Sequence, residues 1–288
     1  MIYTVRAFVR LFRLNRALSA SFGVIFTGLF VGDLVGFQPE YLVAFLVVLF
    51  SALANFGFND YCDLEVDRSN HRLDRPLVQG SLTKGAVLVV TGASTLLALG
   101  LTLFLNPTAR LLVLVGLPVS LFYHVGVKRV FLLKNAFIGL TNVGIVLLGS
   151  LVSDAVVEPV AVYIAAIGFF VALSYEIMLD IADVQGDSAH GIDTIPARFG
   201  VKTASWVSVI LGLGAVIVDP LPYFVMVDPR LHGDALFLLL ILVPVILRLS
   251  ISISLYRDQS RENVLRLKKR AFRNLQLGCL CFLVGILY

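Results

Sequence analysis

Four carboxylates stand within eight residues at the end of an apolar stretch, in the segment from Asn55 to Gly80. Asn59, Asp63 and Asp67 are spaced four residues apart, and Asp60 precedes Asp63 by three. On a helix of 3.6 residues per turn these side chains share one face. Carboxylates stacked that closely repel one another, and each costs about 2.5–3.5 kcal/mol at the middle of a membrane helix. They therefore need a cation, and a divalent metal held by oxygen ligands suits them best.

The same spacing recurs 120 residues later, in the segment from Tyr175 to Gly200, again after a long apolar run. The matched aspartates are Asp60, Asp63 and Asp67 in the first segment and Asp180, Asp183 and Asp187 in the second. Two acidic faces at equivalent places of an internal repeat indicate one shared metal site. Two unrelated solvated charge clusters are the alternative, but they leave the matched spacing unexplained.

Magnesium is the metal that the rest of the chain favours, because it keeps few protein ligands and pairs readily with phosphate oxygens. Basic side chains near the motifs offer further phosphate contacts. They are Arg68, Arg72, Arg75, Lys128 and Arg129. For Lys128 and Arg129 an equal alternative is that they only set the orientation of the chain in the membrane.

Magnesium diphosphate in a very apolar protein indicates a substrate with a charged head and a long hydrocarbon tail, such as a polyprenyl diphosphate. Departure of diphosphate leaves an allylic carbocation, so the site must exclude water.

The elements that position these residues must cross a membrane. The 288 residues are 58% hydrophobic and only 15% charged, with a mean hydropathy of +0.92, whereas a soluble domain carries about 25% charged residues. The apolar runs lack strand-type alternation, so we predict an all-α, polytopic membrane protein with nine transmembrane helices. The predicted spans are 17–36, 41–63, 86–105, 109–126, 133–154, 159–182, 203–219, 234–256 and 270–288. Arginines spaced by three and four through residues 1–16 predict an amphipathic helix at the membrane surface.

Charge sets the expected orientation. Of the 23 basic residues, all but Arg110, Arg230 and Arg248 lie at the N-terminus or near the ends of even-numbered spans. In a protein with nine spans these places are all on the same side of the membrane. Basic loops stay in the cytoplasm, so we expect a multi-pass protein of the cell membrane whose acidic motifs face the cytoplasm. Four spans separate the two acidic helices, which therefore run in the same direction. We predict a single domain, 1–288, with a parallel four-plus-four repeat (about 17–126 and 133–256) plus one helix.

The motifs resemble those of the UbiA-type intramembrane prenyltransferases, and the resemblance covers nearly the whole chain. The family's first motif, N-D-x-x-D-x-x-x-D, is matched by Asn59, Asp60, Asp63 and Asp67, and continues with Arg68, Asn70, Arg75-Pro76-Leu77 and Gly80. Its second motif, D-x-x-D-x-x-G-D, is matched by Asp180, Asp183, Gly186 and Asp187. The segment between the motifs is similar at Tyr123, Lys128-Arg129 and Asn135.

This resemblance implies a nine-helix bundle, a central cavity under a cytoplasmic cap made of the motif loops, and Mg²⁺-dependent prenyl transfer with release of diphosphate. The implied metal ligands are Asn59, Asp60, Asp63, Asp67, Asp180, Asp183 and Asp187. Of these, the implied catalytic residues are Asp63, Asp67, Asp183 and Asp187. The implied diphosphate-binding residues are Arg68, Arg72, Arg75, Lys128, Arg129 and Tyr123.

The expected partners are a prenyl diphosphate, such as geranyl or geranylgeranyl diphosphate, a lipophilic acceptor and the bilayer, with no nucleic acid. The second motif, Glu176-Ile177 and Asn55 resemble the archaeal digeranylgeranylglyceryl phosphate synthase-like branch, which implies geranylgeranylglyceryl phosphate as the acceptor. An aromatic acceptor of the quinone, homogentisate or chlorophyll type is the alternative. An ion or lipid transporter is the rival of a different class, but it would place acids in both halves of the membrane. Arg13, Asn15 and Asn55 are the candidate acceptor-binding residues.

Overall fold

In the computed structural model, residues 2–69, 72–126, 130–189 and 191–288 are described, and they form helices and no strand. Eight helices in these ranges are long and apolar enough to cross a membrane, and a further apolar helix, Pro107–Tyr123, has 17 residues. The predicted all-helical, multi-pass membrane protein is therefore confirmed, whereas the count of nine spans stays a prediction. The chain divides into two compact units, unit 1 with Met1–Lys128 and Gly144–Val157 and unit 2 with Arg129–Val143 and Glu158–Tyr288.

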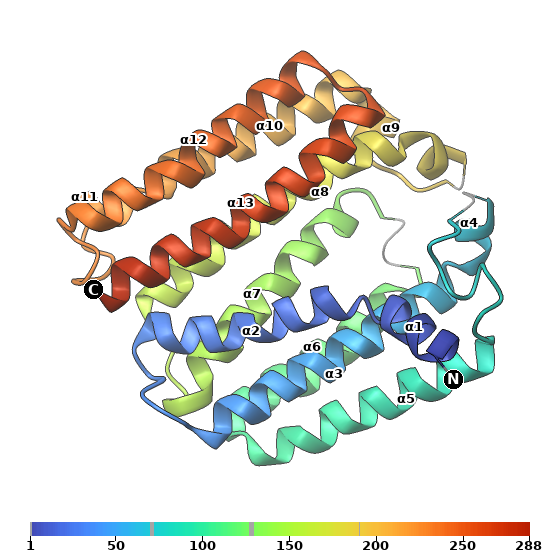
Figure 1. Ribbon diagram of the computed structural model, residues 1–288, viewed down its shortest axis with the longest axis horizontal. Helices are drawn as coiled ribbons and strands as arrows, with labels where there is room; N and C mark the ends of the chain where they lie inside the picture. The colour runs from blue at the N-terminus through green and yellow to red at the C-terminus, as the bar shows by residue number, and fades with distance from the viewer. Residues whose placement is uncertain (1, 70–71, 127–129, 190) are drawn as a thin grey trace. The chain divides into compact units, whose positions relative to one another are not determined.

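Unit 1 is organised around α3 (Pro39–Cys62), which packs against α2 (Leu14–Val31) and α5 (Lys84–Leu101), as Figure 1 shows. Its other elements are α1 (Ile2–Leu11), α4 (Leu64–Ser69), the 3₁₀ helix η1 (Thr102–Phe104), α6 (Pro107–Tyr123) and the C-terminal part of α7 (Leu133–Asp154). The apolar core includes Tyr41, Val47 and Val113. A smaller cluster around Leu11, Leu64 and Leu82 lies at the end that carries the first acidic motif.

Small residues let the helices of unit 1 approach closely. Gly149 of α7 lies against Thr27 of α2, where an added Cβ would stand 2.6 Å from the Cβ of Thr27. Gly28 leaves room for the ring of Tyr41, whose hydroxyl donates a hydrogen bond of 3.1 Å to the carbonyl oxygen of Gly149. Between helices in lipid, close packing and hydrogen bonds supply the association energy that the hydrophobic effect supplies in water.

Asn106 joins two helices of unit 1. Its side-chain oxygen caps α6 by accepting the N–H of Ala109 at 2.9 Å, and its amide donates to the carbonyl oxygens of Leu151 (2.6 Å) and Val152 (3.0 Å) in α7. We expect Asn106→Ala to lower the free energy of unfolding by about 2–3 kcal/mol, because a cap and each buried hydrogen bond are worth roughly 1 kcal/mol. Thermal unfolding in detergent measures the loss.

Thr83→Ala is the matched control for this change. Thr83 caps α5 through a single bond from the N–H of Ala86, so its removal should cost only about 1 kcal/mol. Equal losses for Asn106→Ala and Thr83→Ala would mean that Asn106 serves only as a cap.

Unit 2 contains α8 (Pro159–Ala189), α9 (Ile195–Phe199), α10 (Val201–Val218), α11 (Leu221–Phe224), α12 (Ala235–Arg257) and α13 (Arg261–Leu287). Helix α8 packs against α10 and α13, and α12 packs against the same two helices (Figure 1). Ser174 of α8 and Ser208 of α10 each donate their hydroxyl to the other's carbonyl oxygen at 2.8 Å. Reciprocal bonds of this kind fix the register of two membrane helices.

Most predicted spans agree with the observed helices, but three segments differ. Helix α13 begins at Arg261, before the predicted start at residue 270, and α8 ends at Ala189, after the predicted end at residue 182. The N-terminal segment is the third. The amphipathic helix predicted over residues 1–16 is present as α1 but is shorter: it ends at Leu11, α2 begins at Leu14, and Arg13 between them has φ 44° and ψ 49°. A left-handed arginine ends a helix because its Cβ crowds the backbone there. Helix α2 then ends at Val31, before the predicted end at residue 36. The single domain, the parallel repeat and the cytoplasmic cap stay predictions.

The three basic residues that depart from the predicted charge asymmetry each have a local partner. Arg110 donates to the carbonyl oxygens of Thr102, Leu103 and Leu105, at 3.0–3.1 Å. Arg230 pairs with Asp228 at 2.6 Å. Arg248 pairs with Asp219 at 3.3 Å, and both side chains are nearly buried. Such pairing reduces the cost of a charge in the apolar part of the protein.

Candidate active site

The first acidic motif lies where α3 gives way to α4. The end predicted for this span, at residue 63, agrees with α3, which ends at Cys62, but the helical face predicted for Asn59, Asp63 and Asp67 is interrupted at Asp63, which caps α3 with φ −92° and ψ 3°. Aspartate is a weak helix former and tolerates this bridge conformation. The predicted spacing nevertheless survives, since the N–H of Asp63 bonds to Asn59 O at 2.9 Å and that of Asp67 to Asp63 O at 2.7 Å. The Asn59 amide also donates to Asp63 Oδ2 at 2.8 Å.

Two arginines from distant parts of unit 1 meet at Asp60. Arg13 Nη2 is 2.6 Å and Arg75 Nη1 is 3.0 Å from Asp60 Oδ1, and the Asp60 side chain is only 1% exposed. Arg13 also donates to Asn59 Oδ1 at 3.1 Å, and Arg75 Nε lies 3.5 Å from Asp67 Oδ2. The turn between α1 and α2 and the loop after α4 therefore deliver the cations that offset the first motif.

The electrostatics outside the membrane spans agree with this crowding. Burial raises the pKa of Asp67 above its usual range, against the opposing effect of Arg75. Burial, followed by repulsion from Arg75, lowers the pKa of Arg13 to about 10. The first motif therefore brings carboxylates close to one another and arginines close to one another, so charges of both signs are crowded there.

The donor atoms of the first motif suit a divalent metal. Among the described residues, no donor forms a hydrogen bond with the buried acceptor atoms Asp60 Oδ2 and Asp67 Oδ2, although Arg75 Nε lies 3.5 Å from Asp67 Oδ2. A buried acceptor without a hydrogen bond costs about 1–3 kcal/mol, or more when it is charged. Hard carboxylate oxygens are the ligands that Mg²⁺ prefers. These two buried oxygens, without a hydrogen bond in the described part of the chain, are therefore the observation in unit 1 that fits a metal ion.

A polar network beside this motif includes a histidine that the sequence did not single out. Asn55 donates to Ser120 Oγ at 2.9 Å, and its Oδ1 is 3.2 Å from His124 Nε2. The other ring nitrogen of His124 is 3.5 Å from the Asn59 amide. Tyr123 is buried, with its ring edge-on to that of His124. The end of α6 and α3 are thus joined through groups that reach the first motif.

The second motif, in unit 2, lies on one continuous helix as predicted. Helix α8 runs to Ala189 and carries all three aspartates, of which Asp180 is buried, Asp187 is partly buried and Asp183 is exposed. Lys134 Nζ is 2.8 Å from Asp180 Oδ1 and 3.1 Å from Asp187 Oδ2. Asn135 donates to Asp180 Oδ2 at 2.8 Å. The start of α7 therefore provides a cation and an amide for this face.

The side chains of several residues predicted to bind diphosphate or acceptor form no ion pair or hydrogen bond with the motif aspartates in the described part of the chain. Arg68 pairs with Glu65 at 3.0 Å and Arg72 with Asp74 at 3.4 Å, in largely exposed pairs. Asn15 is exposed. The predicted diphosphate contacts Lys128 and Arg129, together with Asn70 of the first motif, lie outside the described residues.

Sequence reasoning missed Lys134 and His124 as site residues. From the sequence, Lys134 was used only as a basic residue that indicates orientation in the membrane. Its place in the first turn of an apolar span was the pattern that could have marked it as a site residue. His124 directly follows Tyr123, at the end of a span, and a histidine at that place was the corresponding signal.

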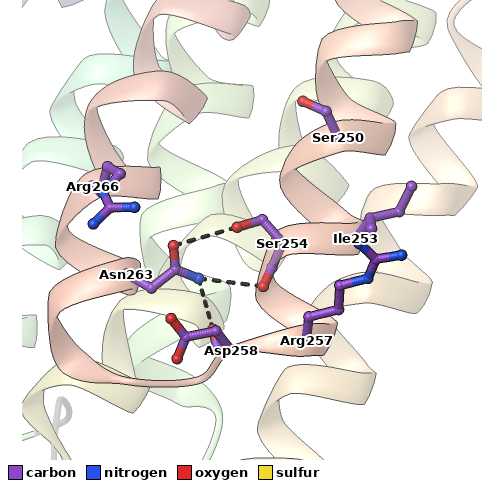
Figure 2. Close-up of a pocket in the computed structure, with 7 residues that line it drawn as sticks. All are labelled: Ser250, Ile253, Ser254, Arg257, Asp258, Asn263 and Arg266. Carbon is purple, nitrogen blue, oxygen red and sulfur yellow. Dashed lines mark hydrogen bonds between the residues drawn. The ribbon is translucent and has the colours of Figure 1, made fainter.

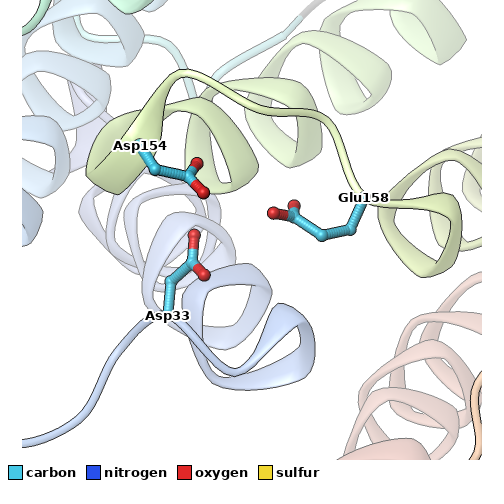
Figure 3. A group of neighbouring side chains, drawn as sticks. All are labelled: Asp33, Asp154 and Glu158. Atoms are coloured by element: carbon cyan, nitrogen blue, oxygen red, sulfur yellow. The ribbon is translucent and has the colours of Figure 1, made fainter.

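Acidic side chains also gather in unit 1 where α2 and α7 end. Asp33 and Asp154 have carboxylate oxygens within 4.8 Å of one another (Figure 3). Figure 3 also draws Glu158, which belongs to unit 2. Asp154 is exposed. Carboxylates in such positions are common without a metal, and neither motif contributes to the group, so we assign it no site.

Comparison with known proteins extends these observations to the whole chain. The UbiA prenyltransferase family matches residues 21–276. The chain is 27% identical to a digeranylgeranylglyceryl phosphate synthase of Archaeoglobus fulgidus, over 98% of this chain and 95% of that protein. A solved structure of digeranylgeranylglyceryl phosphate synthase in membranes has a TM-score of 0.76 and 25% identity over 98% of each chain. A UbiA homologue from Archaeoglobus fulgidus, solved with DMAPP and Mg²⁺, shares the fold with a TM-score of 0.69 and 17% identity, over 96% of this chain and 99% of that one.

The family match spans nearly all of the transmembrane helices and contains both aspartate motifs. The similar proteins also match in length, so no large part of the chain is left unmatched. The chain belongs to the UbiA prenyltransferase family.

Proposed function

We propose that this prenyltransferase moves a prenyl group from a prenyl diphosphate to a lipophilic acceptor in the membrane, and that both aspartate motifs bind the Mg²⁺ diphosphate. The observation that carries the proposal is the pair of buried carboxylate oxygens, Asp60 Oδ2 and Asp67 Oδ2, which accept no hydrogen bond from any described residue. The matched acids of α8 support it, as does the Archaeoglobus fulgidus homologue with DMAPP and Mg²⁺. That protein supports the choice of metal and of substrate class.

The residues of this chain have distinct proposed roles. The metal ligands are Asn59, Asp60, Asp63 and Asp67 in the first motif and Asp180, Asp183 and Asp187 in the second. When bound, Mg²⁺ supplies positive charge that stabilises the departing diphosphate. Arg75 and Lys134 hold the acids in place and present further positive charge to phosphate oxygens. Asn59 orients the carboxylate of Asp63 through its amide.

Arg68, Arg72, Lys128, Arg129 and Tyr123 remain proposed diphosphate contacts. We infer that the first two turn from Glu65 and Asp74 toward the substrate when it binds, because their present pairs are largely exposed. An exposed ion pair is worth only about 0–1 kcal/mol. A diphosphate that offers charge-assisted hydrogen bonds can therefore displace it.

For the acceptor we propose geranylgeranylglyceryl phosphate. The support is the similarity, over almost the full chain, to a digeranylgeranylglyceryl phosphate synthase. Arg13 is the proposed contact for the acceptor, because it reaches the first motif from the turn before α2. Asn55 is a second candidate, held by Ser120 and His124. Asn15 is the third candidate, although it is exposed.

Purified protein with Mg²⁺, a panel of prenyl diphosphates and a panel of acceptors tests the function. We expect mass spectrometry to detect a geranylgeranyl group transferred to the hydroxyl of geranylgeranylglyceryl phosphate. Transfer only to a homogentisate or other aromatic acceptor would contradict the proposed acceptor and retain the reaction type. Absence of any prenylated product would contradict the reaction itself.

We further propose a single domain with a parallel four-plus-four repeat, in which both motifs form a cap on the cytoplasmic side. Single cysteines at Ser81 and Ser188, in a background without Cys62, Cys279 and Cys281, test this arrangement. Both serines are exposed and each follows a motif. We expect both cysteines to react with a membrane-impermeant maleimide only from the cytoplasmic side, since basic loops stay there. Labelling of the two from opposite sides would contradict both the parallel repeat and the shared site.

A further inference from the structure

A polar cavity of about 430 Å³, largely open to the surface, lies in unit 2 at the turn between α12 and α13 (Figure 2). Asn263 lines the cavity and is hydrogen-bonded to the turn. Its amide donates to the carbonyl oxygens of Asp258 (2.7 Å) and Ser254 (3.3 Å), and its Oδ1 accepts a hydrogen bond from Ser254 Oγ at 3.3 Å. Asn263 is 4% exposed, so these bonds hold the turn in one conformation. The cavity is therefore a preformed feature of the turn.

The charge of this cavity is mainly positive. Arg257 and Arg266 line it, and the Arg270 guanidinium donates to Ser250 Oγ in the lining at 2.9 Å. Within the described ranges no carboxylate is within the 4.0 Å of an ion pair from Arg257. Among the described residues, the ion pair of Arg266 is an exposed one with Glu262. The carboxylate in the lining, that of Asp258, accepts the backbone N–H of Ser260 at 2.8 Å. Two arginines in the lining, with a third held next to it through Ser250, match a phosphate group.

An apolar cavity of about 230 Å³ adjoins the polar one. It lies between α10 and α12, and Ile253 lines both cavities. Trp206 and Tyr256, which also line the apolar cavity, pack edge to face with ring centroids 5.0 Å apart. Exposed Trp and Tyr side chains mark the level of lipid headgroups, and Arg257 follows Tyr256 directly. The polar cavity therefore stands at headgroup level, and the apolar cavity beside it opens where a hydrocarbon chain would lie.

We propose that the two cavities together bind one anionic phospholipid of the surrounding bilayer. Its phosphate lies among Arg257, Arg266 and Arg270, and the upper part of one chain lies against Trp206 and Ile253. The site is at the same end of unit 2 as the second aspartate motif, because α9 connects the end of α8 to the start of α10. No motif residue lines either cavity. This lipid is thus a bound component of the protein, separate from the substrates of the transfer reaction.

The test measures lipid retention by the full-length protein. Protein from vesicles that contain equal amounts of phosphatidylglycerol and phosphatidylcholine is transferred to detergent and analysed by native mass spectrometry. We expect wild-type protein to retain phosphatidylglycerol and Arg257→Gln with Arg266→Gln to retain roughly tenfold less, since each basic side chain near the surface contributes to anionic lipid binding. Arg261→Gln with Lys269→Gln removes the same charge outside the cavity and should retain the wild-type amount.

A third variant tests the shape of the site without changing its charge. Ile253→Trp fills the junction of the two cavities, and we expect it to release the lipid as well. Retention of phosphatidylglycerol by Ile253→Trp and by the Arg257/Arg266 variant would overturn the proposal, as would equal losses in the Arg257/Arg266 and Arg261/Lys269 variants. A raised KM for a phosphate-bearing acceptor, with phospholipid retention unchanged, would also overturn it and assign the cavity to the substrate. Retention does not require turnover, so its outcome is independent of the proposed reaction.

Discussion

We expect Asp63→Ala and Asp183→Ala each to reduce kcat/KM for prenyl transfer by roughly a thousandfold. The expected loss is at the upper end of the range for one group that stabilises developing charge, because each change removes a proposed metal ligand rather than a single hydrogen bond. Folding should survive, since Asp63 is only partly buried and Asp183 is exposed. Removal of one carboxylate from a crowded acidic face also relieves repulsion. Initial rates with saturating Mg²⁺, together with thermal unfolding, measure both effects.

Glu65→Ala is the matched control within the same acidic run. Glu65 is exposed, pairs with Arg68 and lies off the face that carries Asn59, Asp63 and Asp67. Its replacement should leave kcat/KM within about threefold of wild type, as expected for a surface ion pair. A comparable loss in Glu65→Ala and Asp63→Ala would mean that the general charge of the segment, rather than the motif face, supports activity.

Lys134→Ala should destabilise the protein strongly when Mg²⁺ is absent. Lys134 contacts Asp180 and Asp187 at once, so its loss leaves two carboxylates, one of them buried, without their shared cation. Breaking a buried pair by removing one partner costs about 3–5 kcal/mol. We expect Mg²⁺ to restore more stability to this variant than it adds to wild type, because in wild type the metal must displace the ammonium group. Thermal unfolding with and without Mg²⁺ measures both values.

Lys202→Ala provides the comparison for this experiment. Lys202 is an exposed lysine in the first turn of α10, also in unit 2. Its replacement should change neither the stability nor the response to Mg²⁺. If Lys134→Ala unfolds at the wild-type temperature and gains no more from Mg²⁺ than wild type, then Lys134 does not act as the cation that balances the second motif.

The sequence was sufficient for the elements that carry the acids. Long apolar runs identified the membrane helices, and the spacing of Asp180, Asp183 and Asp187 correctly predicted one continuous helix, α8. Local spacing was informative here because a helix in lipid must satisfy its own backbone groups. The turn at Asp63 was not predictable from spacing, since the four-residue hydrogen bonds from Asn59 to Asp67 persist through it.

The partners of the acids could not be read from local patterns. Arg13 meets Asp60 across 47 residues of sequence, and Lys134 meets Asp180 across 46. These contacts depend on which helices pack together, which local spacing does not reveal. From the charge pattern alone, Arg13 was placed at the membrane surface and Lys134 at a basic loop. Arg75 was predicted as a phosphate contact, but in this structure it binds Asp60 and Asp67. A basic residue beside an acidic motif has the same sequence signature in either role.

The central claim is that both motifs bind one Mg²⁺ diphosphate, and binding of a non-reactive prenyl diphosphate analogue tests it most directly. Calorimetric titration separates binding from chemistry, so it applies equally to wild type, Asp63→Ala and Asp183→Ala. We expect tight binding by wild type with Mg²⁺, and binding weaker by about a hundredfold with EDTA or in either variant, because each condition removes part of a charge-assisted site. Wild-type affinity in the Asp183→Ala variant, or affinity unchanged by EDTA, would contradict the claim.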